Sequence, residues 1–164
     1  MAKSIHETLI YPDTNVETVA ALAADPAFRS AVAAYQHALR SDLTVAPTAD
    51  GRKIRFEYAH GTERVPSFAK KLAGDEIPII QEETWHGDKA DVLITIPGKP
   101  GDMRGTITLE QRGADVAQVV DLTVKVGIPL VGGKIEDLIA GLLTKAARAE
   151  NKVGLKWLAG EWQA

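Results

Sequence analysis

Cysteine is absent from this chain of 164 residues. Its absence excludes disulfides, thiolate nucleophiles, iron–sulfur clusters and cysteine-ligated zinc. The fold must therefore be held by packing and hydrogen bonds alone. With 45% hydrophobic and 25% charged residues, the chain carries enough apolar material for a core, and we expect one domain over residues 1–164.

The chain also lacks an excess of positive charge. It has 19 lysines and arginines against 22 aspartates and glutamates, a formal net charge of -3. Only nine residues are aromatic, three each of Trp, Tyr and Phe, and none is interleaved with a basic cluster. A phosphate backbone would meet no basic field, so we expect no nucleic-acid partner.

Long hydrophobic runs are missing too. No uninterrupted apolar stretch approaches the roughly 18 residues that a membrane-spanning helix needs. Residues 1–30 contain no basic segment followed by an apolar one, as a secretory signal would. We therefore expect a cytoplasmic protein with no integral membrane association.

The first part of the chain predicts a strand over residues 3–11, ended by Pro12, and then two short helices. Thr14 and Glu17 fit a capping box at the start of the first helix, with Asn15 as an alternative cap. The second helix begins at Asp25, where aspartate caps and a proline follows at the first helical position.

From Ser41 the hydrophobic period changes to two, which predicts antiparallel strands with short turns. A hairpin at Asp50-Gly51 joins the first two strands, and residues 66–72 form either a helical turn or a loop. Four further strands are predicted over residues 78–86, 90–96, 104–112 and 116–126.

A long amphipathic helix is predicted over residues 134–153, about 30 Å in length. Its apolar stripe comprises Ile135, Leu138, Ile139, Leu142, Ala146, Ala149 and Val153. The stripe changes from bulky residues to alanines, which leaves two alternatives. Either a cavity opens beneath Ala146 and Ala149, or the alanines let the helix approach the sheet closely.

This order of elements, together with two motifs, resembles the START-like (SRPBCC, helix-grip) superfamily. One motif is the junction Ile128–Glu136 before the last helix, and the other is Gln81–Trp85, with Glu82 in place of a more usual threonine. The chain is most similar to an uncharacterised family found mostly in high-GC Gram-positive bacteria. The resemblance implies an α+β fold in which a long C-terminal helix packs across the concave face of a curved, seven-stranded antiparallel sheet. It also implies a pocket between them for a hydrophobic or amphipathic molecule.

The glycines and lysine of the junction do not form a phosphate-binding loop. Such a loop needs Gly, four residues, and Gly-Lys followed by Ser or Thr, whereas here the first position is Ile128 and Lys134 is followed by Ile135. The glycines instead predict a sharp turn from strand into helix. The signatures of zinc hydrolases, serine hydrolases and calcium loops are also absent, so we expect no metal and no cofactor.

Titratable residues concentrate on the strand over residues 78–86. Glu82 and His86 share one face of this strand, and Glu83 shares the other with Trp85. The sequence does not decide which face is inward, although the bulk of Trp85 favours its own. His60 is in phase with Tyr58 and is expected at the mouth of the inner face.

Three hypotheses follow. The first is a binding or carrier module for an apolar lipid- or polyketide-like molecule, with His60 or Glu83 as the polar contact that orients the ligand. The residues expected to line its cavity are Tyr58, Trp85, Leu109, Leu122, Val124, Leu142 and Ala146. The second is a cyclase- or dehydratase-type enzyme in which His60, Glu83 or Glu82 transfers a proton. The third is a module that binds a protein partner of unknown identity, and it requires an exposed apolar patch that the polar outer strand faces do not offer.

Overall fold

A computed structural model describes residues 2–163 of the protein, and it confirms the α+β fold. All seven strands join one antiparallel sheet in the spatial order β1-β7-β6-β5-β4-β3-β2. The strands are β1 (Ala2–Tyr11), β2 (Arg40–Thr48), β3 (Gly51–Gly61), β4 (Glu76–His86), β5 (Lys89–Thr95), β6 (Asp102–Arg112) and β7 (Asp115–Lys125). The helices are α1 (Val16–Ala23), α2 (Pro26–Tyr35), α3 (Ser67–Ala73) and α4 (Gly132–Leu158).

Local signals account for the two helices that follow β1. The side chain of Asn15 accepts a hydrogen bond from the backbone N–H of Thr18 at 2.9 Å, so Asn15 is the cap of α1 and the capping box predicted at Thr14 is wrong. Asp25 caps α2 as predicted, through bonds to the N–H groups of Ala27 and Phe28. The segment that was open between a helical turn and a loop is α3.

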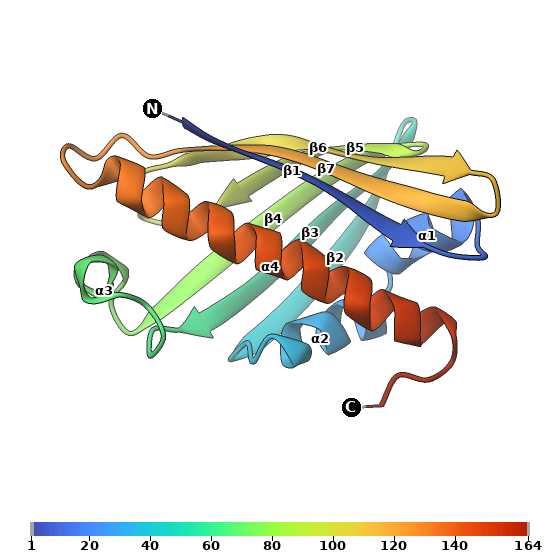
Figure 1. The fold of residues 1–164 in the computed structure, drawn as a ribbon, viewed down its shortest axis with the longest axis horizontal. Coiled ribbons are helices and arrows are strands. Elements are labelled where there is room, and N and C mark those ends of the chain that lie inside the picture. Colours follow the sequence, from blue (N-terminus) through green and yellow to red (C-terminus); the bar gives the residue numbers. More distant parts are fainter. Residues whose placement is uncertain (1, 164) are drawn as a thin grey trace.

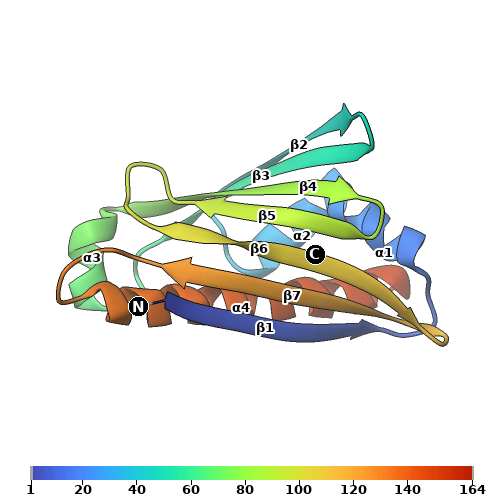
Figure 2. The same ribbon diagram turned by 90° about the horizontal axis from the view of Figure 1, so that it is seen from above.

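The sheet curves strongly, and glycine permits the curvature at β6. A Cβ on Gly105 would lie 1.8 Å from the carbonyl oxygen of Asp121 on β7. Only glycine allows two strands to approach this closely, so this position must lack a side chain. The curvature carries β2 and β3 away from the plane of β1 and β7, as Figure 2 shows.

Helix α4 crosses the concave face diagonally (Figure 1). Its sheet-facing residues recur at alternating spacings of four and three: Glu136, Ala140, Leu143, Ala147, Glu150, Gly154 and Trp157. This face is rotated from the predicted stripe, because Leu142 is 46% exposed whereas Leu143 is buried. Two glutamates and a glycine on the buried face concealed it from a search for hydrophobic periodicity.

Glycines bring both ends of α4 close to the sheet. A Cβ on Gly132 would lie 2.5 Å from the carbonyl oxygen of Val126, and one on Gly154 would lie 2.6 Å from the ring of Tyr11. Near the first glycine, a carboxylate oxygen of Glu136 also accepts the backbone N–H of Val126 at 2.8 Å. The helix is thus docked at two points about six turns apart.

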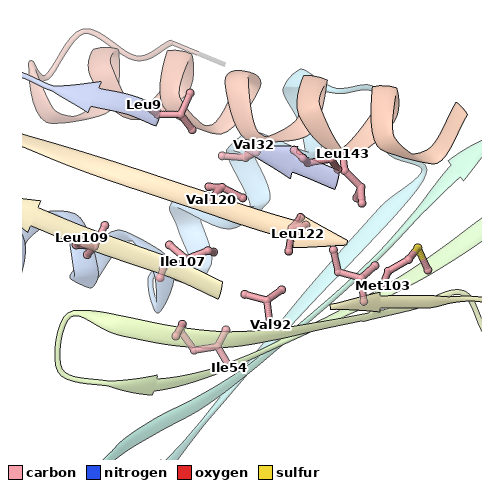
Figure 3. Packing of buried hydrophobic residues seen from close by; sticks show 14 of the residues in the cluster. Leu9, Val32, Ile54, Val92, Met103, Ile107, Leu109, Val120, Leu122 and Leu143 are labelled. Carbon is pink, nitrogen blue, oxygen red and sulfur yellow. The ribbon is translucent and has the colours of Figure 1, made fainter. Parts of the chain in front are cut away.

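The main hydrophobic core lies between the concave face and helices α1, α2 and α4 (Figure 3). It includes Ile54, Val92, Ile107 and Leu122 from the sheet and Leu143 from α4. A smaller cluster of Ala33, Phe56 and Tyr58 lies between α2 and β3, with Ile79 packed against it. The concave face is therefore covered unevenly along its length.

Candidate functional site

A buried ion pair lies at the centre of the concave face. Arg29 on α2 donates from Nη2 to both carboxylate oxygens of Glu83 on β4, at 2.8 and 2.7 Å. The two side chains are 3% and 0% exposed. The Nε of Arg29 donates to the carbonyl oxygen of Ala23 at 2.9 Å, and its guanidinium lies over the ring of Phe56, 5.3 Å from the centroid.

Two further donors saturate the carboxylate of Glu83. Gln81 donates at 2.6 Å and the indole Nε1 of Trp85 donates at 2.9 Å. All three residues lie on the inner face of β4, which settles the orientation that the sequence left open. Four donor contacts from three side chains therefore occupy the carboxylate oxygens of Glu83. A general base needs a free lone pair to accept a proton, so this arrangement does not favour Glu83 as a base.

A second carboxylate reaches this cluster from α4. Glu150 accepts from Arg29 Nη1 at 3.4 Å and from Gln118 Nε2 at 3.5 Å, and its side chain is 20% exposed. Burial raises the pKa of Glu150, Arg29 lowers it, and Glu83 raises it again, so that the net shift is upward. The cluster contains two carboxyl groups and one guanidinium, so protonation of Glu150 makes it neutral.

The cationic member of the cluster stays charged. Burial by itself lowers the pKa of Arg29, but the two carboxylates offset that effect and raise the pKa above its usual value. Tyr11, at the side of the cluster near Glu150, has its pKa raised by burial and by the negative charge of Glu150. Arg29 and Tyr11 therefore both keep their protons at neutral pH.

A small cavity adjoins these groups. Its volume is about 10 Å³, room for about one water molecule. The cavity is lined by Tyr11, Val19, Leu22, Ala23, Arg29, Glu83, Trp85, Ile107, Leu109, Gln118 and Glu150. We call this part of the concave face the sealed half. Neither Ala146 nor Ala149 lines this cavity, so it is not the cavity that one of the two alternatives placed beneath them.

The other part of the concave face is less covered. His60 on β3 and Ile77, Ile79 and Gln81 on β4 are all half-buried, and we call this set the open half. His60 pairs with Ile77 in the register of β3 and β4, and Tyr58 pairs with Ile79, so these side chains form two adjacent rows. Gln81 connects the two halves through its hydrogen bond to Glu83.

Contacts of α4 show which of its sides faces the open half. Asp137 pairs with Lys3 at 3.4 Å, Arg148 with Glu7 at 2.6 Å, and Asn151 donates to Ile10, all on the edge strand β1. The opposite side of the helix is therefore turned toward β3, β4 and α3, as Figure 1 shows. That side carries Leu138, Leu142 and Ala146.

The structure places the predicted cavity residues in two groups. Tyr58, Trp85, Leu109, Leu122 and Val124 are buried on the inner face, and of these Trp85 and Leu109 line the small cavity. Leu142 is exposed, so the prediction that it lies against the sheet as part of a buried stripe is wrong, and Ala146 is half-buried.

The candidate proton-transfer residues are separated. Glu83 is inside the core, whereas Glu82 lies on the outer face and pairs with Lys53 at 3.1 Å. His60 is at the open half, where its ring meets that of Tyr58 edge to face at 5.5 Å. The choice that the sequence left open between the two carboxylates is thus decided, because Glu83 faces inward and Glu82 faces outward.

Sequence reasoning missed Arg29 and Glu150. Arg29 follows Phe28 on the buried face of α2, and its position there is visible only when α2 is placed against β4. Glu150 does have a sequence signal, because it is 14 residues after Glu136 and seven after Leu143, on the same helical face. Neither residue was singled out, because charged residues are rarely buried.

The described part of the chain was also searched for metal-binding groups and membrane-spanning helices. Within residues 2–163, no group of three His, Asp or Glu side chains is arranged to hold a metal ion. No helix in that range is long and apolar enough to span a membrane.

Comparison with known sequences identifies the family. The family described as "Protein of unknown function (DUF2505)" matches residues 8–158, so this protein belongs to it. No curated protein sequence matches the chain significantly. The uncharacterised family inferred from the junction and strand motifs is consistent with this assignment.

Solved structures confirm the START-like fold. The chain is similar to the protein TTHA0849 from Thermus thermophilus, with a TM-score of 0.66 and 18% identity over 98% of this chain and 100% of that one. A START superfamily protein from Mycobacterium smegmatis gives a TM-score of 0.60 and 16% identity, covering 92% and 97%. The di-domain ARO/CYC protein BexL, of the BE-7585A biosynthetic pathway, gives 0.61 and 13%, covering 94% of this chain and 49% of that one. At these identities the likeness is one of fold.

Proposed function

We propose that this protein binds an amphipathic small molecule, lipid-like or polyketide-like, on the open half of its concave face. One observation carries the proposal. His60, Ile77, Ile79 and Gln81 remain partly exposed on the inner face of the sheet, on the side to which the exposed Leu142 of α4 is turned. A sheet face and a helix side with exposed apolar groups favour a ligand between them.

The arrangement of groups matches a molecule with an apolar body and a few polar atoms. Ile77 and Ile79 offer apolar contact from β4, and Leu142 offers it from α4. Hydrogen bonds are offered by His60, which lies on β3 beside Ile77, and by Gln81, which follows Ile79 on the inner face of β4. Few polar groups among apolar ones is the usual composition of small-molecule sites.

The protonation state of the site favours an uncharged polar group on the ligand. Burial lowers the pKa of His60 below its ordinary value, so the imidazole is neutral at neutral pH. Burial also raises the pKa of Tyr58 to about 12, so that its phenol stays protonated. Neutral donors and acceptors suit a hydroxyl or carbonyl group better than a carboxylate or an amine.

The sealed half acts as a rigid support in this proposal. Its cavity of about 10 Å³ is too small for an organic ligand, and Glu83 and Arg29 satisfy each other. Gln81 is held by Glu83 at 2.6 Å, which fixes the position of its amide for a ligand. A preorganised polar group loses less entropy on binding than a mobile one.

Similar folds are compatible with this proposal. The solved structures of similar fold include a START superfamily protein and two di-domain ARO/CYC proteins of biosynthetic pathways. The proposal itself depends on the residues of the open half.

The experiment is native mass spectrometry of gently purified protein, followed by extraction of any bound molecule. We expect a bound mass in the wild type that is lost in Leu142→Gln. Leu155→Gln is the matched control, because Leu155 is also on α4, is 39% exposed, and lies on the side that faces β1. Absence of a bound mass, together with failure of the open-half amide signals to shift when hydroxylated fatty acids or aromatic polyketides are added, would contradict the proposal.

A second candidate function is acid–base catalysis of the cyclase or dehydratase type. The raised pKa of Glu150 favours it, because the side chain is 20% exposed and a protonated carboxyl group that a substrate can reach is able to act as a general acid. Glu150 replaces Glu83, Glu82 and His60 in this role. The test is dehydration of β-hydroxyketone probes by wild type and Glu150→Gln; equal rates would remove this candidate.

A further inference from the structure

One end of the molecule exposes bulky apolar side chains from two segments far apart in the sequence. Phe68 and Leu72 lie one helical turn apart on α3, and each is 38% exposed. Leu130, in the connection from β7 to α4, is 101% exposed. Both views show α3 and this connection at the same end of the fold (Figures 1 and 2).

The backbone of Leu130 adds an independent observation. Its φ is 71°, in the left-handed region that residues with a Cβ rarely adopt. Glycines stand at positions 127, 132 and 133 of the same connection, yet the position with the glycine-like conformation carries a leucine. A strained residue that holds an apolar side chain fully in solvent contributes nothing to packing, which points to a role in binding.

The charge around these side chains differs from that of the whole chain. Residues 62–75 and 126–134 contain four cations, Arg64, Lys70, Lys71 and Lys134, against two carboxylates, Glu63 and Asp75. The protein as a whole has a formal net charge of -3. Across residues 2–163, no salt bridge engages Lys70, Lys71 or Lys134.

We propose that this end, formed by α3 and the connection from β7 to α4, docks on the surface of an anionic lipid membrane. Leu130, Phe68 and Leu72 enter the boundary between head groups and acyl chains, and Lys70, Lys71 and Lys134 contact the phosphates. Bulky apolar groups beside unpaired lysines are the combination that such a surface attracts. A protein partner is the alternative occupant of this surface, and the test must distinguish it from a membrane.

The proposal gives the Ile128–Glu136 junction a role beyond turning the chain. The junction ends in a helix that is docked by Gly132, so the loop that presents Leu130 is fixed at both sides. The membrane-facing end also adjoins the open half, since α3 connects β3 to β4. Membrane docking does not rest on the proposed ligand. Vesicle binding by a protein that yields no bound molecule would support membrane docking and not the ligand proposal. A bound molecule without vesicle binding would support the ligand proposal and not membrane docking.

The test is co-sedimentation of the full chain with vesicles of phosphatidylcholine alone and of phosphatidylcholine with phosphatidylglycerol. We expect binding to the anionic vesicles only, decreasing as salt is raised. The double substitution Lys70→Glu and Lys71→Glu is expected to lower the partition coefficient by about ten-fold or more. Equal recovery with both vesicle types, or wild-type binding by this variant, would overturn the proposal.

Leu130→Gly is the most informative single variant. It removes the apolar side chain and suits the positive φ, so we expect unchanged or increased stability with several-fold weaker vesicle binding. Leu155→Gln and Lys156→Glu, at the other end of α4, are the matched controls and should bind vesicles like the wild type. Undiminished binding by Leu130→Gly, with stability retained, would show that this end is not the docking surface.

Discussion

The sealed and open halves of the concave face share strands β3 and β4 but differ in what covers them. In the sealed half, Glu83 is enclosed by Arg29, Trp85 and Gln81, and α4 adds Glu150 from above. In the open half, the same two strands present His60, Ile77 and Ile79 with partial exposure. The difference shows that α4 and α2 close over one part of the sheet and leave another available for contact.

The chemistry of the two halves differs as well. The sealed half contains charged groups in a region with almost no free volume, so these groups mainly bind one another. The open half has neutral polar groups and apolar ones that remain partly exposed. Substitutions in the sealed half should therefore change stability, whereas those in the open half should change binding. Four predictions test this comparison.

The largest effect is expected from Arg29→Ala. It leaves the fully buried carboxylate of Glu83 without its cation, a change that costs about 3–5 kcal/mol of unfolding free energy. Urea unfolding measures this loss. The control is Arg55→Ala, which removes an exposed pair with Glu57 and should change stability by about 1 kcal/mol or less. Similar small losses for both variants would mean that the sealed half is not held by its ion pair.

The next prediction compares adjacent leucines on α4. Leu143→Ala should cost about 2–5 kcal/mol because Leu143 is 9% exposed and belongs to the main core. Leu142→Ala should cost about 0.5 kcal/mol or less, since Leu142 is exposed, yet it should weaken ligand binding. Urea unfolding and native mass spectrometry distinguish the two outcomes. A reversal of the stability effects would show that the predicted stripe faces the core after all.

A third prediction concerns the close approach of α4 to β1. Gly154→Ala places a Cβ 2.6 Å from the ring of Tyr11 and should destabilise the protein by about 1–3 kcal/mol. Gly141→Ala is the control within the same helix, where a Cβ meets nothing within 4 Å. It should stabilise the protein by about 0.5–1 kcal/mol through its helix propensity. Thermal unfolding of both variants checks the opposite signs.

The smallest expected effect is a pH dependence of stability from Glu150. Its pKa is raised in the folded state, so the folded state retains the proton at pH values where the unfolded state has released it. Stability should therefore fall as pH rises from the ordinary pKa of glutamate through the raised pKa. Urea unfolding across this range should show a shallower decline in Glu150→Gln than in wild type. Identical pH profiles of stability for the two proteins would show that Glu150 does not titrate in this range.

Regular patterns in the sequence were enough to predict most of the fold. The alternation in β3 through β7, the cap at Asp25 and the amphipathic period after Lys134 all depend on neighbours a few residues apart. The resemblance carried by the Ile128–Glu136 junction then identified the START-like arrangement. Details failed where two local signals competed, as at Thr14 and Asn15, where only the backbone geometry of the turn selects the cap.

The candidate site could be predicted only in part. Tyr58 was assigned to the inner face correctly, because an aromatic residue in phase with apolar neighbours is normally buried. For the strand of Trp85 the sequence left the face open, although the bulk of Trp85 favoured the side that is inward. Arg29 and Glu150 were missed because each is charged, and its burial is compensated by groups more than 50 residues away or on another element. Helix periodicity therefore located α4 along the chain but misjudged its rotation.

The sequence by itself determined the strands, the turns, the helices and the absence of cysteine chemistry, because these follow from local propensity and composition. The tertiary structure decided which face of β4 is inward, which side of α4 meets the sheet, and how far α4 and α2 cover the concave face. Those outcomes depend on the long-range pairing of Arg29 with Glu83 and on the contact of Gly154 with Tyr11. A buried charge is tolerated only beside its partner, and that partner is brought near only by the complete fold.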